Sequence, residues 1–342
     1  MKVSMWTMAK GQFNKLPAVS KADLTGKTVL VLGANTGLGF EASKHFASMN
    51  PGRLILACRS QSRGQAALED LQAKTGYSRA EVWIVDLAEF ASVTRFADKF
   101  EQDGGRLDIL VENAARAQLK YEPTKDGWES SLQINDLSTP LVALRLLPRM
   151  MQTAREHKTV ARIVVVSSEM HYVAEIPKEL LARGDVLATL GSADYCTPTN
   201  MRSSYNITKL LNLLFVRELN ARLGPTAPLI VDAVNPGMCV SELRRDLPAF
   251  LAFIFRTLER IMAFTAEQGS RQLVFGALGE PTNPDALRGA YINQSRIEEP
   301  SDFVIGAEGH KAQGQIWDEL VEILKKVDPR VSATVDQYLS GA

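Results

Sequence analysis

Short apolar runs alternate with amphipathic stretches along most of the chain, beginning near Lys27. The runs are TVLVL (28–32), RLILAC (53–58), EVWIV (81–85), LDILV (107–111), RIVVVS (162–167), LIVDAV (229–234) and GAYIN (289–293). Strands that read as continuous apolar runs are buried on both faces, and helical stretches between them are typical of the crossovers of a parallel sheet. Seven such strands in series predict a doubly wound, Rossmann-type α/β fold with a parallel seven-stranded sheet.

The same rhythm sets the expected domain boundaries. Residues 1–26 are polar and irregular, so we expect a leader that lies across the domain, and residues 331–342 are expected to form a C-terminal tail. Residues 27–330 contain no Pro/Gly/Ser linker and no internal repeat, which predicts a single domain. Two segments, about 169–203 and 238–264, interrupt the rhythm beyond predicted strand ends. Ligands bind at that edge of open α/β sheets, so these segments are predicted to be substrate lids.

The composition narrows the class of protein. Lys and Arg total 39 of the 342 residues and Asp and Glu also total 39, so there is no electrostatic reason to expect nucleic acid or an anionic membrane as partner. The three cysteines are far apart, and no His, Cys or carboxylate cluster has metal-ligand spacing, which favours reduced thiols and no metal. No signal-peptide core and no run of roughly 18 apolar residues is present, so we expect a cytoplasmic protein without a membrane span.

A glycine-rich turn follows the first predicted strand directly. It reads Gly33, Ala34, Asn35, Thr36, Gly37, Leu38, Gly39, and a helical stretch follows. Glycines allow a tight turn and close backbone approach, while the N-terminus of the helix offers free N–H groups to a pyrophosphate. Glycine turns are common, but the strand before and the helix after this one favour a dinucleotide site.

Arg59 decides which dinucleotide the sequence favours. An NAD-binding chain places Asp or Glu about 20 residues past the glycine loop, where it holds the ribose 2′-OH. Arg59 occupies that register, at the end of the second predicted strand, and a cation there suits the 2′-phosphate of NADP(H). The alternative is a solvated surface arginine. Asp86, after the third strand, is interpreted either as an acceptor for the adenine amino group or as a helix cap.

Tyr205 and Lys209 open a predicted helix and are four residues apart, so they project from the same helical face. An unperturbed Tyr, with a pKa near ~10, is a poor proton donor at neutral pH. A nearby ammonium stabilises the phenolate and makes the group usable for proton transfer. Such a pair also arises by chance, so its context carries the argument.

Three further positions supply that context. Ser168 ends the fifth strand, where its hydroxyl either binds a substrate oxygen or closes a turn. Asn135 lies within an apolar periodic stretch, where a buried Asn must find partners, and is either structural or part of a water-linked relay. Pro236 and Gly237 follow the sixth strand at the ligand-binding edge.

Together these residues resemble the short-chain dehydrogenase/reductase family, and within it the retinol dehydrogenase and carbonyl reductase-like members. The resemblance implies that Tyr205 is the general acid/base, Lys209 tunes it and holds the nicotinamide ribose, Ser168 orients the carbonyl, and Asn135 supports the relay. The cofactor contacts it implies are Gly33, Asn35, Thr36, Gly37, Leu38, Gly39, Arg59, Asp86, Leu87, Asn113, Ala114, Tyr205, Lys209, Pro236, Gly237, Cys239 and Ser241.

The chain also departs from the family pattern. Leu32 replaces the usual Thr before the first glycine, and Glu112-Asn113-Ala114-Ala115 stands where Asn-Asn-Ala-Gly is usual. His171 is near the proposed site, and we interpret it as a surface or lid histidine. Cys239 borders the nicotinamide in the family's geometry, although small cysteines are usually packing residues.

The sequence therefore predicts an NADPH-dependent reductase of a carbonyl group, or the reverse alcohol oxidation, acting on a lipophilic small molecule or a secondary metabolite. The alternative is a non-catalytic NADP(H)-binding sensor or scaffold with the same fold. The apolar stretch Leu247–Phe264 is either a lid over the substrate or an amphipathic helix packed on the core or on a second subunit. A homodimer is thus one of the options that the sequence leaves open.

Overall fold

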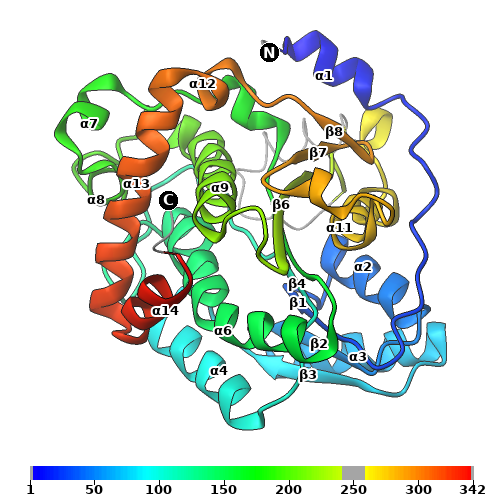
Figure 1. Ribbon diagram of the computed structural model, residues 1–342. Helices are drawn as coiled ribbons and strands as arrows, with labels where there is room; N and C mark the ends of the chain where they lie inside the picture. Colours follow the sequence, from blue (N-terminus) through cyan, green and yellow to red (C-terminus); the bar gives the residue numbers. More distant parts are fainter. Residues whose placement is uncertain (1–2, 241–258, 340–342) are drawn as a thin grey trace.

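The computed structural model describes residues 3–240 and 259–339. A single eight-stranded sheet runs through them in the order β3-β2-β1-β4-β5-β6-β7-β8 (Figure 1). Strands β1 to β7 pair in parallel, whereas β8 pairs antiparallel with β7. The predicted doubly wound parallel sheet is confirmed, but the predicted number of seven strands is one too few.

The eighth strand, β8 (Arg296–Glu298), forms a short hairpin with β7. Gln294 and Ser295 at its turn have φ values of 52° and 57°, which are the positive values that a tight two-residue hairpin requires. Only three residues long and largely exposed, β8 has neither the length nor the apolar content that marks a buried strand in the sequence.

The other strands coincide with the predicted apolar runs. Their bounds are β1 Thr28–Leu32, β2 Arg53–Cys58, β3 Ala80–Ile84, β4 Ile109–Glu112, β5 Ala161–Val166, β6 Leu229–Asn235 and β7 Tyr291–Asn293. Strands β1, β4, β5 and β6 are buried at every position, because helices cover both faces of the sheet.

Two layers of helices enclose the sheet (Figure 1). One layer is α2 (Gly37–Ala47), α3 (Gln61–Thr75) and α11 (Ala266–Leu278), whose apolar side chains join those of one sheet face. The other contains α4 (Phe90–Asp103), α6 (Thr139–His157) and α9 (Met201–Leu223). Outside it lie α13 (Ala307–Val327) and α14 (Arg330–Tyr338).

The strand order reverses between β1 and β4. The chain moves outward from β1 through β2 to β3, then returns to place β4 on the other side of β1. At such a switch point the loops leaving neighbouring strands diverge, and a crevice opens beyond their carboxyl ends. The fold therefore places a ligand site beside the glycine loop that follows β1.

Both ends of the chain contain ordered structure. Within residues 1–26 a short helix, α1 (Met5–Gly11), precedes an extended segment. Within 331–342, α14 continues to Tyr338, and Val331 and Leu339 are fully buried in the core. The predicted boundaries at 26 and 331 therefore do not mark the edges of the packed structure.

The predicted lid at 169–203 contains the short helices η2 (Glu169–Val173), α7 (Lys178–Arg183) and α8 (Val186–Leu190). Leu180, Leu187 and Leu190 of this segment are buried in the core. Most of the second predicted lid, residues 241–258, lies outside the described residues. The remaining short elements are α5 (Ser130–Leu132), η1 (Gln133–Ser138), η4 (Pro284–Leu287) and α12 (Asp302–Ile305).

Candidate active site

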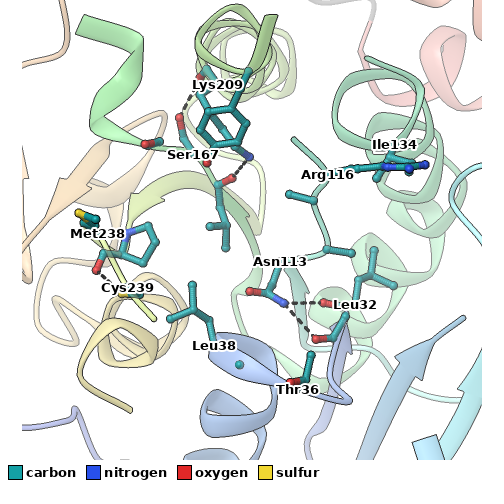
Figure 2. Close-up of a pocket in the computed structure, with 18 of the residues that line it drawn as sticks. Leu32, Thr36, Leu38, Asn113, Arg116, Ile134, Ser167, Lys209, Met238 and Cys239 are labelled. Carbon is teal, nitrogen blue, oxygen red and sulfur yellow. Dashed lines mark hydrogen bonds between the residues drawn. The ribbon is translucent and has the colours of Figure 1, made fainter. Parts of the chain in front are cut away.

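A cavity of about 680 Å³ opens at the carboxyl ends of the central strands (Figure 2). Leu32 of β1, Asn113 after β4, Val166 of β5 and Pro236 after β6 all line it. Every predicted site residue that the structure describes lines this cavity, except Gly39 and Asn135, which lie behind its wall. The predicted positions therefore converge on one site.

The glycine loop forms one end of the cavity. Gly33 and Gly37 have φ values of 73° and 58°, a region that disfavours other residues. A Cβ on Gly39 would lie 2.4 Å from Gly33 O, so no side chain fits where α2 approaches β1. A Cβ on Gly37 would meet no atom within 4 Å, because this glycine faces open space. The loop is thus closely packed where α2 approaches β1 and open at Gly37, which lines the cavity, so that a phosphate would have room there.

Asn113 fixes this loop from the neighbouring strand. Its Nδ2 donates hydrogen bonds to Leu32 O at 3.1 Å and to Gly33 O at 3.2 Å (Figure 2). Both acceptors are backbone carbonyls, so the side chain at position 32 plays no part in this link. The departure at Leu32 therefore leaves the loop's anchor to β4 intact.

Tyr205 and Lys209 project from the first turns of α9 toward the cavity. Lys209 Nζ lies 5.7 Å from the centroid of the Tyr205 ring. The ammonium donates hydrogen bonds to Val166 O at 2.7 Å and to Asn212 Oδ1 at 2.9 Å. Lys209 is 2% exposed, and this burial lowers its pKa to about 8, although the nearby Asp136 opposes the shift. Its geometry suits an ammonium that stabilises a phenolate.

Asn135 is held in η1, one turn of π-helix before α6. Its Nδ2 donates to Arg116 O at 2.9 Å and Thr208 Oγ1 at 3.1 Å, and its Oδ1 accepts from Arg116 N at 2.9 Å. The side chain is thus fully engaged in joining η1 to α9 and to the loop after β4. Single π-turns within α-helices are frequent at functional sites.

A second asparagine connects Asn135 to the lysine. Asn212 Nδ2 donates to Asn135 O at 2.8 Å and to Asp136 Oδ1 at 2.9 Å, while Asn212 Oδ1 accepts from Lys209. Burial raises the pKa of the Asp136 carboxyl well above its ordinary value. A continuous line of hydrogen bonds therefore runs from Lys209 through Asn212 to a buried carboxyl.

Ser168 and the preceding serine have different roles. Ser167 Oγ is buried and donates to Lys209 O at 2.8 Å, which ties β5 to α9 (Figure 2). Ser168 Oγ lines the cavity and accepts from Met170 N at 3.2 Å, so its own hydrogen stays available for a ligand oxygen.

His171 is fully buried, so its interpretation as a surface histidine is wrong, and it lies within the segment 169–203 that was predicted to be a lid. Its Nε2 accepts from Ser301 N at 3.2 Å, which leaves Nδ1 to donate to Ser168 O at 2.8 Å. Burial lowers the pKa of His171 to about 4, so the ring is neutral. It anchors the backbone of Ser168 to the chain after β8.

The end of the cavity beyond β2 is positively charged. Arg59 lines it and is exposed, and no hydrogen bond or salt bridge joins its guanidinium to another residue of 3–240 or 259–339. Arg63, four residues later on α3, lines the same end. Ser60 caps α3 by accepting from Arg63 N.

Asp86 does not cap α4, which begins at Phe90 with Glu89 at its N-cap. Its Oδ1 instead accepts from Ala88 N at 3.0 Å in a local turn, and the residue lines the cavity between β3 and α4. Leu87, next in the chain, is buried beside it.

The loop after β6 closes the opposite wall. Pro236, Gly237, Met238 and Cys239 line the cavity, and Cys239 Sγ donates to Pro236 O at 3.2 Å. Cys239 is buried and packs with Leu16 and Phe264, as expected of a packing cysteine. Ser241 lies outside the described residues.

Comparisons with known proteins agree with this geometry. Residues 27–177 match the family model described as short chain dehydrogenase. The short chain dehydrogenase/reductase dmxR8 of Cryptosporiopsis sp. (strain 8999) is 35% identical over 327 residues, which cover 94% of this chain and 97% of that protein. The short chain dehydrogenase sol3 of Alternaria solani is also 35% identical, over 84% of this chain and 95% of its own.

The chain belongs to the short-chain dehydrogenase/reductase family. Solved structures agree on the fold at lower identity. A short chain dehydrogenase from Escherichia coli CFT073 complexed with NADPH superposes with a TM-score of 0.60 at 19% identity, covering 81% of this chain and 100% of its own. L-sorbose reductase from Gluconobacter frateurii, complexed with NADPH and L-sorbose, gives a TM-score of 0.58 at 19% identity, over 80% and 97%.

This short-chain dehydrogenase/reductase also has cavity residues that sequence reasoning missed. Arg63 follows Arg59 by one helical turn, so its spacing was a usable signal. Gln12 and Met8 of the N-terminal segment carried no signal, since a polar leader does not reveal where it packs. Outside the cavity lining, sequence reasoning also missed Asn212, which lies one turn beyond Lys209 on the same predicted helix and accepts a hydrogen bond from it.

Two absences apply to residues 3–240 and 259–339. No helix there is long and apolar enough to cross a membrane. In the same residues, no group of three or more His, Cys, Asp or Glu side chains is arranged to hold a metal ion.

Proposed function

We propose that the chain is an NADP(H)-dependent oxidoreductase that reduces a carbonyl group of a lipophilic small molecule, or oxidises the corresponding alcohol. One observation carries the proposal. Tyr205 and a buried Lys209 face the same cavity into which the glycine loop opens. A proton-transfer pair and a nucleotide cradle in one cavity are the two parts that hydride transfer to a carbonyl needs.

The residues present fit a dinucleotide. The pyrophosphate would lie against the open face of Gly37 and the N-terminus of α2. Asn113 and the Pro236–Cys239 loop flank the path toward Lys209. Bound there, the nicotinamide would supply the hydride.

Arg59 and Arg63 favour the phosphorylated cofactor. Both residues line the cavity end beyond β2, and within residues 3–240 and 259–339 the register of the ribose-binding Asp or Glu is occupied by Arg59. An arginine fork matches a phosphate in charge and geometry. The E. coli structure and the L-sorbose reductase were both solved with NADPH, which supports the same preference.

The chain's own residues would handle the oxygen and its proton. Ser168 donates its free hydroxyl hydrogen to the carbonyl oxygen and so orients it. Tyr205 would transfer its phenolic proton to that oxygen. Lys209 stabilises the resulting phenolate, and Asn212, hydrogen-bonded to Lys209, connects the pair to Asp136.

The rival function is a non-catalytic NADP(H) sensor or scaffold. The test is NADPH oxidation by the purified protein with a panel of ketones, aldehydes and quinones, followed by Tyr205→Phe with the best substrate. General acid catalysis typically contributes about 10²–10⁴-fold, so turnover should fall by that factor while NADPH affinity is kept. Absence of turnover on the whole panel, or a Tyr205→Phe variant as fast as the parent, would favour the rival.

A further inference from the structure

We propose that Glu169, together with Gln12 of the N-terminal segment, forms a polar subsite that binds a hydroxyl group of the substrate away from the reacting carbonyl. The inference rests on the proposed function, because the subsite would bind another part of the substrate whose carbonyl group is reduced. Glu169 lines the cavity and directly follows Ser168, the residue proposed to orient the carbonyl.

The Glu169 carboxyl has unused hydrogen-bonding capacity. Among the described residues its one hydrogen bond comes from Gln12 Nε2, at the long distance of 3.4 Å. A carboxylate has about four acceptor positions on its two oxygens. No lysine or arginine of the described residues forms a salt bridge with it. A ligand in the cavity therefore meets a carboxyl that the protein has not already satisfied.

Gln12 holds the Glu169 carboxyl in position. Its side chain is 7% exposed, and its Oε1 accepts from Met238 N at 3.2 Å while its Nε2 faces Glu169. The end of α1 is itself fixed, because Gln294 Nε2 donates to Gly11 O at 2.9 Å. The N-terminal segment thus bridges the loop after β6 and the segment after β5, and forms a wall of the cavity.

The electrostatic surroundings favour a neutral donor over a cation. Burial and the nearby Glu298 raise the pKa of Glu169 to about 7, so the group is present in both charge states near neutral pH. Both forms accept a hydrogen bond from a hydroxyl. A substrate hydroxyl loses less hydration free energy on entering this largely apolar cavity than a substrate ammonium would.

The cavity also has a set of apolar and adaptable side chains. Met5, Met8, Met170, Met238 and Met262 all line the cavity. Methionine is flexible and makes favourable contacts with aromatic rings, so these side chains suit flat ring systems of varied shape. The substrate class that fits is a lipophilic, ring-containing carbonyl compound with a hydroxyl group remote from the carbonyl.

The test compares benzophenone with ortho-, meta- and para-hydroxybenzophenone, and with the corresponding methoxy ethers, which match in size but cannot donate. NADPH oxidation is measured for the parent, Glu169→Leu and Glu175→Leu. Glu175 is an exposed carboxylate in the same segment that does not line the cavity, so its variant is the control. We expect one hydroxy isomer to exceed its methoxy ether in kcat/KM by about tenfold to hundredfold, with Glu169→Leu alone abolishing this preference.

A binding measurement separates this inference from the proposed function. Tyr205→Phe saturated with NADPH is titrated calorimetrically with the same compounds, with and without Glu169→Leu. A hydroxyl preference that depends on Glu169, without turnover in the parent, would support the subsite and refute the reductase. Equal affinity for every hydroxy and methoxy pair, or a preference that survives Glu169→Leu, would overturn the subsite.

Discussion

Lys209 and Asn212 are joined by a hydrogen bond of 2.9 Å between Nζ and Oδ1, and both residues are buried. Asn212 has its amide nitrogen turned away, toward Asn135 O and Asp136 Oδ1. The lysine is thus connected by one side chain to a carboxyl that is 4% exposed. When Asp136 is ionised, it raises the pKa of the ammonium that is proposed to tune Tyr205, and Lys209 in turn opposes the effect of burial on the pKa of Asp136.

Asp136→Asn should shift the pH profile of catalysis toward acid. Burial lowers the pKa of Lys209 to about 8, even though the Asp136 carboxylate opposes this shift. Removing that carboxylate should therefore lower the pKa of Lys209 further. Lys209 must carry its proton to stabilise the phenolate, and activity that falls as pH rises through this pKa should therefore fall at lower pH in the variant. The measurement is kcat/KM against pH.

Asparagine keeps an oxygen that can accept from Asn212, so the hydrogen-bond pattern has a replacement partner. Asp194→Asn, at an exposed position, is the control and should leave the profile unchanged. Coincident alkaline limbs for the parent and Asp136→Asn would show that the carboxyl does not act on Lys209.

Arg59→Asp should change the cofactor preference. The variant loses a charge-assisted contact with the 2′-phosphate, worth about 1.5–3 kcal/mol, and gains the carboxylate that suits a ribose 2′-OH. We expect the ratio of kcat/KM for NADPH to that for NADH to fall by roughly tenfold or more. Equal efficiency with both cofactors in the unmodified protein would refute the assignment of Arg59.

Gly39→Ala should weaken NADPH binding and destabilise the fold. Its Cβ would lie 2.4 Å from Gly33 O and 2.5 Å from Asn113 Nδ2, so the loop must move away from its anchor. Overpacking of this kind typically costs about 1–3 kcal/mol. NADPH affinity and the free energy of unfolding in urea would both be measured.

Gly314→Ala provides the matched control, because that Cβ meets no atom within 4 Å in the middle of α13. It should raise stability by about 0.5–1 kcal/mol through helix propensity and leave NADPH affinity unchanged. If Gly39→Ala binds NADPH as tightly as Gly314→Ala does, the close approach behind the loop is not needed for the cofactor.

His171→Gln should destabilise the protein at neutral pH, and this difference should shrink in acid. The folded ring has a pKa of about 4 against an ordinary value of 6.5, so the unfolded chain binds the proton more readily between these values. The parent accordingly loses stability as pH falls from about 6.5 to 4, by about 3 kcal/mol in total, whereas the glutamine variant lacks this loss. Urea unfolding of both proteins at several pH values measures the difference.

The parent must be compared with His171→Gln, because protonation of Glu169 changes the stability of the fold in the opposite direction to protonation of His171. Its raised pKa, about 7, means that the folded state gains stability as pH falls through that value. In the parent alone, the two neighbouring groups largely offset each other between about pH 4.5 and 6.5. A destabilisation by His171→Gln that is constant from pH 7 to 4 would contradict the assignment of a buried neutral ring.

The sequence predicted the features that local pattern encodes. Buried parallel strands need continuous apolar runs, so β1 to β7 were visible, and a four-residue spacing on a helix placed Tyr205 beside Lys209. Features made by contacts between distant segments were not visible. Gln12 meets Glu169 across 157 positions, and His171 meets Ser301 across 130, so neither residue's own neighbours reveal its burial.

Some predicted roles were displaced by specific contacts. Of the two roles expected for Asp86, the helix cap is wrong, because α4 starts further along the chain and its Phe90 N donates to Asp126 Oδ2. The contact with adenine stays a prediction. The departure at Glu112 also has a structural outcome. Both of its carboxyl oxygens are buried with no hydrogen-bond partner among the described residues, and burial raises its pKa well above the ordinary value. Where the family has an amide, this chain carries a buried carboxyl whose pKa is raised by burial.

The N-terminal segment supplies part of the cavity lining without supplying any residue proposed for proton transfer. Residues 3–14 contribute Met5, Met8, Ala9 and Gln12 to the cavity, yet they include none of the groups proposed for proton transfer and precede the first strand of the sheet. Exchanging this stretch between relatives would therefore transplant one face of the substrate cavity onto an unchanged catalytic core. If the cavity binds the substrate as proposed, substitutions in residues 3–14 would change the side chains that the substrate meets and leave Tyr205, Lys209 and Ser168 in place.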